Sequence, residues 1–388
     1  MRKVAIIAGG MGPWGVREAT LRDLIAEGAK AAFDDNKNIK PKDVQGLLLA
    51  SAFPERNSFQ THTAPLAMEV CGITASKLIG RVELLCGSGT LAIQLAYAHI
   101  AAGLSDVIMV VGAEKLYMPD KWETFFNMQC ACDRDFDNIH GLGVPPPLFA
   151  MIAKKHMKEY GTTEEQMAMV SVKAHKNSAR NPYAQFQKPV TLDEVMSSVR
   201  VVDPLKVFDC CAVTDGAAAV ILASEERAKD FSPHPIWILS IGQASTHKNS
   251  ANVPGFITWP NLRMAAGDAY KRAGIKPDDV DVAATHDCFT ISEIIEYEDF
   301  GWCEKGEGGR FIENGLSDIG GKVPVNPDGG LLGCGHPFGA TGVRQAQEMM
   351  HQLRGDAKNQ VKGAKIALQH TLSGFVSDST VIIYGRGE

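Results

Sequence analysis

The chain has 388 residues, of which 45% are hydrophobic and 22% are charged, so it can bury a large core and hold more than one domain. Its net charge is −6 and no run of Lys and Arg stands out, which argues against nucleic acid as a partner. No segment has the apolar length of a bilayer-spanning helix, so we expect no membrane partner. The apolar run at the start is too short for a signal peptide, and nine cysteines without such a signal predict free thiols in the cytoplasm.

The first part of the chain alternates between strand and helix patterns. Strand-like apolar runs occupy residues 3–8, 44–50, 82–86 and 107–112, and residues 16–33 carry apolar side chains at helical spacing. Strands that alternate with helices favour parallel pairing through crossover connections, so the pattern predicts an α/β fold. An apolar strand at residues 217–223 is expected to complete this first sheet.

The alternating pattern is lost between residues 116 and 206. This segment mixes Met, Trp, Phe and Asp with the run Pro145-Pro-Pro147, and it contains helical stretches at residues 148–160 and 163–179. It is too structured for a linker, so we interpret it as an inserted loop domain that covers a site. The predicted organisation is an N-terminal half at residues 1–115, which ends with residues 207–232, an inserted loop domain at residues 116–206, and a C-terminal half at residues 233–388.

The second part starts the same pattern again. Strands are predicted at residues 236–241, 280–284, 365–369 and 380–384, and helices at residues 261–273 and 339–353. The sequence Ile39-Lys-Pro-Lys-Asp-Val44 returns as Ile275-Lys-Pro-Asp-Asp-Val280, each time between a helix and a strand. Internal repetition of this length predicts two similar α/β halves packed about a pseudo-two-fold axis.

Cys86 is the first candidate for a catalytic residue. It ends the predicted strand at residues 82–86, and the sequence Gly87-Ser-Gly89 forms a tight turn into a helix over residues 90–102. The positive end of that helix is expected to lower the pKa of the thiol and to favour the nucleophilic thiolate. A cysteine that serves only as a small core side chain is the alternative, and it stays open at this point.

Three further stretches follow the strands of the second part. In open α/β sheets sites form at the ends of strands, so two facing halves would bring these loops toward Cys86. The stretches are Thr285-His286-Asp-Cys288-Phe289, the glycine-rich segment from Asn326 to Gly342 with Cys334-Gly-His336-Pro337 inside it, and Gln369-His370-Thr-Leu372-Ser-Gly374.

These motifs resemble those of the thiolase superfamily. Cys86-Gly-Ser88, His286-Asp-Cys288-Phe289 and Gly335-His336-Pro337 stand in the family's order, with Gly339-Ala-Thr-Gly342 after the last. The form His-Asp-Cys-Phe is similar to the sterol-carrier-protein-type branch, where ordinary thiolases carry Asn-Glu-Ala-Phe. The resemblance runs through the whole chain. It implies the thiolase fold, with two duplicated βαβαβαββ halves packed as a five-layer αβαβα core and an inserted loop domain.

The resemblance also implies an activity. A CoA-dependent thiolase cleaves a 3-ketoacyl-CoA, or forms it by Claisen condensation, through an acyl group carried on Cys86. His336 is expected to take the thiol proton, and His286 and His336 would line the oxyanion site of the enolate. Coenzyme A is then a substrate, and we expect no tightly bound cofactor and no metal.

The chain departs from the family near its C-terminus. Most thiolases take a second catalytic cysteine from a Cys-X-Gly motif there, and this chain has His370-Thr-Leu372 instead. The resemblance to the sterol-carrier-protein-type branch implies that Cys288 has the second acid/base role. Cys334 and His370 are the alternatives. The candidate contacts for substrate and for the phosphates of CoA are Gly374, Leu372, His370, His140, Lys173 and Arg180.

The resemblance further implies a homodimer or a dimer of dimers and, in this branch, a small zinc-ribbon/OB-fold partner protein. It leaves the acyl group open between a short aliphatic one, as in acetoacetyl-CoA, and an aromatic one such as that of benzoylsuccinyl-CoA. Two other functions stay open from the sequence. One is a Cys86-dependent acyltransferase without Claisen chemistry, and the other is a non-catalytic acyl-CoA or lipid carrier or scaffold subunit.

Overall fold

The computed structural model describes residues 1–246 and 256–387. Within these residues a mixed nine-stranded sheet has the order β3-β2-β4-β7-β1-β8-β11-β10-β9, and β5 and β6 form a separate two-stranded sheet. The strands are β1 (Val4–Met11), β2 (Gly46–Ala50), β3 (Leu78–Val82), β4 (Val107–Glu114), β5 (Arg200–Val202), β6 (Leu205–Lys206), β7 (Gly216–Ser224), β8 (Ile236–Ser245), β9 (Val282–Ala284), β10 (Ile366–Ser373) and β11 (Asp378–Arg386).

The helices lie on the faces of this sheet and around its rim. They are α1 (Leu21–Asp35), α2 (Pro54–Asn57), α3 (Thr63–Val70), α4 (Ser88–Ala101), α5 (Lys121–Met128), α6 (Pro146–Tyr160), α7 (Glu164–Ser178), α8 (Leu192–Met196), α9 (Glu225–Phe231), α10 (Pro260–Ala273), α11 (Thr290–Asp299), α12 (Gly308–Glu313) and α13 (Phe338–Arg354). No helix among the described residues combines the length and the apolar character that crossing a membrane requires.

The two halves of the large sheet repeat one another. Outward from the centre, β1, β7, β4 and β2 match β8, β11, β10 and β9, and in both sets the last pairing is parallel while the others are antiparallel. The halves meet through a short antiparallel pairing of Ala5 with Trp237 and of Ile6 with Ile236. The duplication predicted from the sequence is therefore confirmed, although only part of the pairing is parallel as the alternation had suggested.

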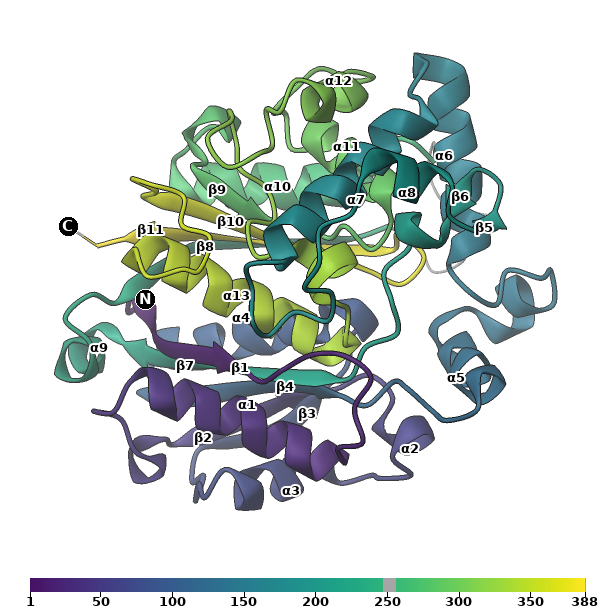
Figure 1. Ribbon diagram of the computed structural model, residues 1–388. Helices are drawn as coiled ribbons and strands as arrows, with labels where there is room; N and C mark the ends of the chain where they lie inside the picture. The colour runs from purple at the N-terminus through teal and green to yellow at the C-terminus, as the bar shows by residue number, and fades with distance from the viewer. Residues whose placement is uncertain (247–255, 388) are drawn as a thin grey trace.

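Five layers result from this arrangement. Figure 1 shows α4 and α13 between the two halves of the sheet, α1 and α3 beyond one half, and α10 and α11 beyond the other. Three apolar cores fill the spaces between layers, and the middle one joins side chains of α4 and α13 with both halves. Because α4 and α13 share this middle layer, their N-terminal ends come close together.

The repeated hexapeptide forms the same local structure twice. Pro41–Asp43 and Pro277–Asp279 are one-turn 3-10 helices that each enter a strand. In each, the aspartate carboxylate accepts the backbone N–H three residues earlier, at 2.9 Å from Lys40 and 2.7 Å from Lys276. The same short sequence thus closes the same turn in both halves.

Two predicted elements differ from the structure. The strand expected at residues 82–86 is wrong, because β3 ends at Val82 and Cys86 lies in a one-turn 3-10 helix at Leu85–Gly87. Ser88 Oγ accepts the Leu84 N–H at 2.8 Å and donates to the Leu85 carbonyl at 2.6 Å, which closes the turn and prevents an extended chain. The helix expected from residue 16 begins at Leu21, because Thr20 and Asp23 form a capping box there.

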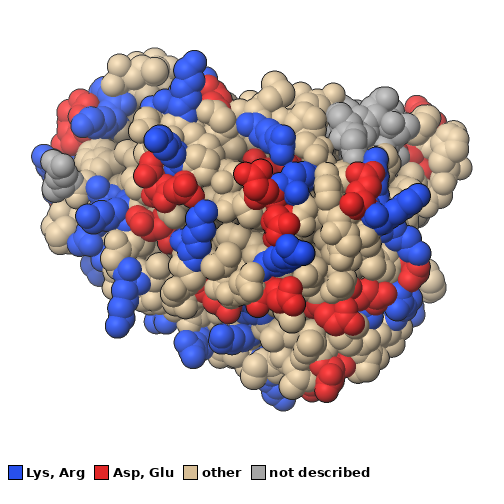
Figure 2. Space-filling model, turned by 90° about the horizontal axis from the view of Figure 1, so that it is seen from above, with Lys and Arg blue, Asp and Glu red and all other residues tan. Residues whose placement is uncertain are grey.

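The segment of residues 116–206 contributes α5 to α8, β5 and β6, which lie along one side of the core in Figure 1. Helix α7 packs on α11 and on the turn at Gly330–Cys334, so this segment is attached mainly to the second half. The face of the molecule in Figure 2 carries basic and acidic side chains interspersed with one another.

Candidate active site

Cys86 and His336 come from different halves and are in direct contact. His336 precedes α13, and its Nε2 lies 3.2 Å from the Sγ of Cys86, which precedes α4. Glycines allow the two helices to approach this closely. A Cβ on Gly342 would lie 2.6 Å from the Thr90 nitrogen, and a Cβ on Gly89 would lie 2.9 Å from the Gly339 oxygen. The small residues around the motifs therefore bring the thiol and the imidazole together.

The tautomer of His336 follows from its second contact. Its Nδ1 lies 2.7 Å from Thr341 Oγ1, and that hydroxyl donates to the Pro337 carbonyl at 3.0 Å. Since the hydroxyl proton is used on Pro337, Nδ1 carries the proton that Thr341 accepts. Nε2 then has a free lone pair directed at the Cys86 thiol. This geometry suits a base that removes the thiol proton.

The electrostatics of the pair differ from the expectation for Cys86. Burial raises the pKa of the Cys86 thiol to about 12, so the expected depression by the helix terminus is wrong for the free protein. Burial, together with the neighbouring His286, holds the pKa of His336 well below its usual range. Both groups are therefore neutral at rest, and a thiolate at Cys86 would require transfer of its proton to a base within reach, which His336 is.

His286 lies beside this pair. Its ring centroid is 5.0 Å from that of His336, and the ligand atoms of Cys86, His286 and His336 all lie within 4.8 Å of one another. Burial holds the pKa of His286 well below its usual range, and its Nδ1 has no hydrogen-bond partner among the described residues. A neutral imidazole that lines the cavity beside His336 is available to a substrate oxygen.

A buried carboxylate fixes the backbone of His286. Both oxygens of Glu296 accept the His286 N–H at 3.2 Å, and His370 Nδ1 lies 3.0 Å from the same carboxylate. The neighbouring Asp287 accepts the N–H of Leu331 at 2.7 Å and so ties the His286 loop to the glycine-rich turn before His336. The two histidine loops are thus held against each other by acceptors inside the second half.

A carboxylate of the first half holds the backbone at the start of α13. Glu114 ends β4, and its buried carboxylate accepts the N–H groups of Ala52, Phe53 and Gly339 at 2.7, 3.0 and 2.9 Å. Burial raises the pKa of Glu114 to about 7. Because Gly339 belongs to the first turn of α13, this side chain binds the two halves together next to the site.

An apolar cavity of about 490 Å³ opens onto Cys86, His286 and His336. Cys288 also lines it, with its Sγ 3.8 Å from Ser292 Oγ, and so do Leu372 and Gly374. Cys211 lines the same cavity, and its N–H donates to the Cys288 carbonyl at 2.9 Å. Burial raises the pKa of Cys288 and of Cys211 well above the usual range of a thiol. Cys288 and Cys211 are therefore further protonated thiols in the cavity of Cys86.

The structure separates the remaining candidates. His370 is buried behind the cavity, between Glu296 and Ser379, so its predicted substrate contact and its rival acid/base role are wrong. Cys334 is fully buried in the middle core, where Asn181 Nδ2 lies 3.6 Å from its sulfur, so it is no rival either. Both were placed near the site by sequence adjacency, and both side chains turn away from it.

The residues predicted to contact CoA lie in different surroundings. Lys173 is buried, and its ammonium pairs with Glu293 and lies 3.2 Å from the Tyr297 hydroxyl, so it is not free to meet a phosphate and that assignment is wrong. His140 is exposed, with Nδ1 2.7 Å from the Phe136 carbonyl, and lies outside the residues that line the cavity. Arg180 is exposed just beyond the end of α7, and its role stays a prediction.

Sequence reasoning missed several residues of the site. Thr341 sits inside the Gly339-Ala-Thr-Gly342 motif, so its spacing from His336 was a usable signal. Glu114 had none, and neither did His175, which lines the cavity, because a strand-terminal glutamate and a helical histidine are common. No motif singles out Cys211, and only the cavity shows that it lies at the site.

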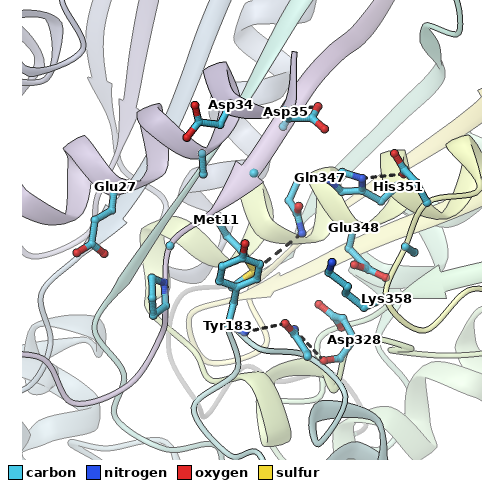
Figure 3. Close-up of a pocket in the computed structure, with 18 of the residues that line it drawn as sticks. Met11, Glu27, Asp34, Asp35, Tyr183, Asp328, Gln347, Glu348, His351 and Lys358 are labelled. Atoms are coloured by element: carbon cyan, nitrogen blue, oxygen red, sulfur yellow. Dashed lines mark hydrogen bonds and ion pairs between the residues drawn. The ribbon is translucent and has the colours of Figure 1, made fainter. Parts of the chain in front are cut away.

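A second hollow, also about 490 Å³, lies away from this chemistry. Figure 3 shows Glu27, Asp34 and Asp35 of α1 on one side and Gln347, Glu348 and His351 of α13 on the other. Three of its charged groups are paired, since Arg354 donates to both Asp35 and Asp356, and His351 Nδ1 lies 2.8 Å from Asp356. We assign this hollow no part in the chemistry of Cys86.

Comparisons with known proteins point to one family. A family model described as thiolase, N-terminal domain, matches residues 4–226, and one described as thiolase C-terminal domain-like matches residues 242–386. An acetyl-CoA acetyltransferase of Methanothermobacter thermautotrophicus is 38% identical over 388 residues, which is 100% of both chains. A benzoylsuccinyl-CoA thiolase subunit of Thauera aromatica is 34% identical over 96% of this chain and 95% of its own length. Sterol carrier protein 2 of Oryctolagus cuniculus is 39% identical over 81% of this chain but only 60% of its own length.

Solved structures show the same architecture. One described as Ltp2-ChsH2(DUF35) aldolase superposes with a TM-score of 0.85 at 27% identity, over 99% of this chain and 97% of its own. Human mitochondrial 3-ketoacyl-CoA thiolase in complex with CoA superposes with a TM-score of 0.75 at 19% identity, over 100% of this chain and 98% of its own, and supports the fold alone. With family models over nearly all of its length and a relative that matches it from end to end, the chain belongs to the thiolase family and is an acyltransferase of the thiolase type.

Proposed function

We propose that this thiolase cleaves a 3-ketoacyl-CoA, or forms it in the reverse direction, through an acyl group carried on Cys86. The observation that carries the proposal is the 3.2 Å contact between Cys86 Sγ and the free lone pair of His336 Nε2. The thiol proton passes to Nε2 while the sulfur attacks the keto carbon. The bond between C2 and C3 of the substrate then breaks, and the acyl group stays on Cys86 as a thioester.

The leaving group is the enolate of a CoA thioester, which needs a hydrogen-bond donor and a proton. A neutral His286, which lines the cavity beside His336, is placed to donate to the enolate oxygen. We assign the proton donor to Cys288, whose high pKa keeps its thiol protonated until the carbanion takes the proton. The products of this half-reaction are an acyl-CoA and the Cys86 acyl-enzyme.

The second half-reaction restores the enzyme. The Cys288 thiolate takes the proton of incoming CoA, and the CoA thiolate attacks the acyl-enzyme carbonyl. Cys86 leaves as a thiolate and regains its proton from His336, so all atoms and protons balance. Support for Cys288 as the second thiol comes from its place in the cavity with Cys86, and Cys211 is the alternative in the same cavity.

The test follows acyl-enzyme formation and carbon–carbon cleavage separately. Mass spectrometry after incubation with acetyl-CoA should show one acetyl group on the wild type and none on Cys86→Ser. Cys288→Ala should still be acetylated, but its thiolysis of acetoacetyl-CoA should fall about 10²–10⁴-fold, because it lacks the acid. The matched control Cys211→Ala should keep both activities.

Two results would contradict this assignment. Full cleavage activity in Cys288→Ala combined with its loss in Cys211→Ala would transfer the acid/base role to Cys211. A wild type that is acetylated yet cleaves no 3-ketoacyl-CoA would be an acyltransferase without Claisen chemistry.

We further propose that the enzyme is a homodimer or a dimer of dimers in the cytoplasm and binds a small zinc-ribbon/OB-fold protein. Cys86, Cys211 and Cys288 carry free thiols, which fits a reducing compartment. The Thauera relative is named as a subunit, and the description of one structural neighbour joins two protein names. Helix α5 exposes Trp122 and Phe126, apolar side chains that a partner would cover. Light scattering after size-exclusion chromatography, with and without a co-purified small protein, measures both assemblies.

A further inference from the structure

Cys86, His286 and His336 form a compact set of metal-ligating groups. One ligand atom from each residue, a sulfur or a ring nitrogen, lies within 4.8 Å of the other two. Around a tetrahedral Zn²⁺ ion such atoms lie about 3.4–3.6 Å apart, because the metal is about 2.3 Å from sulfur and about 2.0–2.1 Å from nitrogen. Cys86 Sγ and His336 Nε2 are already 3.2 Å apart. Movements of at most about 1.5 Å between any two of these atoms therefore produce the geometry of a zinc site.

The two imidazoles are in the state that a metal ion requires. A histidine coordinates as the neutral ring, and burial holds the pKa of both His286 and His336 well below the usual range. His336 Nδ1 lies 2.7 Å from Thr341 Oγ1, which directs the lone pair of Nε2 toward the sulfur. Metal-ligating histidines almost always have such a contact at the other nitrogen. His286 Nδ1 has no hydrogen-bond partner among the described residues, so no bond at that nitrogen fixes the tautomer of the ring.

The donor atoms select the class of ion. A thiolate with two imidazoles suits Zn²⁺ and similar borderline cations, whereas Mg²⁺ and Ca²⁺ prefer oxygen ligands. A second close set in the described part of the chain consists of Asp35, His351 and Asp356. Arg354 donates to both of its carboxylates, so a guanidinium already neutralises that set. The set at Cys86 has no such cation in contact with its sulfur among the described residues, and we regard it as the stronger candidate.

His286 supplies the third ligand and distinguishes this chain from ordinary thiolases, which carry Asn at the equivalent place in their motif. Three protein ligands with a fourth position left open are typical of zinc sites that exchange water or a substrate. Cys86, His286 and His336 all line the apolar cavity. The fourth position is thus left to a water molecule that enters from the cavity.

We propose that Cys86, His286 and His336 bind one Zn²⁺ ion, or a cation of the same class, and that the bound ion inhibits the enzyme reversibly. Binding replaces the thiol proton of Cys86 by a bond from sulfur to the metal. The proton is released to solvent, and no group is oxidised or reduced. The ion then occupies the sulfur that would carry the acyl group and the lone pair that would take its proton. Inhibition rests on the proposed thiolase function, whereas binding of the ion does not.

The first test measures binding by the full chain without an activity assay. Titration of the wild type with Co²⁺ should produce a thiolate-to-metal charge-transfer band that saturates at one equivalent, and Zn²⁺ should displace the Co²⁺ because it binds more tightly. Mg²⁺ should give no change. Cys86→Ser should lose the charge-transfer band, because its hydroxyl replaces the thiolate. Absence of the band in the wild type, or its persistence in Cys86→Ser, would overturn the proposal.

The second test compares Zn²⁺ affinities measured by competition with a chelator. His286→Asn keeps Cys86 and His336 but removes the third ligand, so its affinity should fall by more than about 100-fold. Thr341→Val removes only the contact at Nδ1 of His336 and should weaken binding by about 10–100-fold. His351→Ala is the matched control, because it removes a ligand from the other set and should bind as the wild type does. Equal affinities of His286→Asn and the wild type would refute a three-ligand site.

The third test joins binding to activity. Saturating Zn²⁺ should block both thiolysis of acetoacetyl-CoA and alkylation of Cys86 by iodoacetamide, and EDTA should restore both. Cleavage and alkylation that continue at saturating Zn²⁺ would contradict the proposal. A wild type that shows the Co²⁺ band at Cys86 but cleaves no 3-ketoacyl-CoA after treatment with EDTA would contradict the thiolase function and leave the metal site standing.

Discussion

The N-terminal ends of α4 and α13 occupy equivalent places in the two halves, since α4 precedes β4 and α13 precedes the matching strand β10. The two helix starts carry different residues and are held by different contacts. The turn before α4 presents Cys86 and is closed by Ser88, within five residues of chain, and Ser373 of the other half donates to its Leu84 carbonyl. The start of α13 is held from outside its own half, because Thr214 accepts the His336 N–H at 3.0 Å and Glu114 accepts the Gly339 N–H.

This difference fits the tasks of the two side chains. A base must keep one tautomer and one direction, so His336 is fixed at its backbone and at Nδ1. A nucleophile needs mainly access to the substrate and proximity to the base, and Cys86 is half-buried at the cavity surface. The duplication thus places two helix N-termini close together. Different residues at the two termini, Cys86 and His336, then have different parts in the proposed reaction.

The largest expected effect comes from replacing His336, the proposed base that the second half contributes to the site. His336→Gln should lower kcat for thiolysis about 10²–10⁴-fold, because no base then takes the Cys86 proton. Alkylation of Cys86 by iodoacetamide should become slow at neutral pH and rise steadily toward alkaline pH, since the thiol has a pKa of about 12. Thr341→Val, which leaves His336 in place without its Nδ1 partner, should show a smaller decrease. Rapid alkylation of His336→Gln at neutral pH would show that the helix terminus activates the thiol alone.

The next effect comes from forcing the two helix termini apart. A Cβ at Gly342 would lie 2.6 Å from the Thr90 nitrogen, so Gly342→Ala should lower the free energy of unfolding by about 1–3 kcal/mol and also lower kcat. Gly267→Ala is the matched control, because Gly267 lies in exposed α10 with open space at its Cβ position. It should raise stability by about 0.5–1 kcal/mol and leave kcat unchanged. Urea unfolding and steady-state kinetics measure both variants, and equal behaviour of the two would refute the close-contact explanation.

The third expected effect is a dependence of stability on pH, at the carboxylate that joins the halves. Burial raises the pKa of Glu114 from 4.5 to about 7, so between these values the folded protein holds a proton that the unfolded chain has released. The unfolding free energy of the wild type should therefore fall, relative to Glu114→Gln, by at most about 1.4 kcal/mol per pH unit as the pH rises through this range, and then level off. Asp34→Asn is the control, because exposed Asp34 has a pKa lowered to about 2 and titrates below the window. A constant difference between wild type and Glu114→Gln would contradict the assignment.

Local sequence accounts for much of the fold. The hexapeptides at residues 39–44 and 275–280 specify the same proline-initiated turn, because the aspartate that closes each turn lies three residues from its partner. The Thr20–Asp23 capping box was equally local, yet the apolar spacing alone placed the helix start too early. The strand expected up to Cys86 failed because an apolar run does not reveal that Ser88 closes a turn over it.

The sequence by itself determined the family, the duplicated halves and which thiol and imidazoles come together in the candidate site, because these depend on short motifs, their order and glycines that let backbones approach. Only the tertiary structure decided which other side chains share the cavity. Lys173 is neutralised by Glu293 and Cys334 is enclosed in the middle core, while Cys211 and His175 line the cavity. Such outcomes depend on contacts between residues far apart in the chain, and these contacts set burial and pairing, which no spacing pattern encodes.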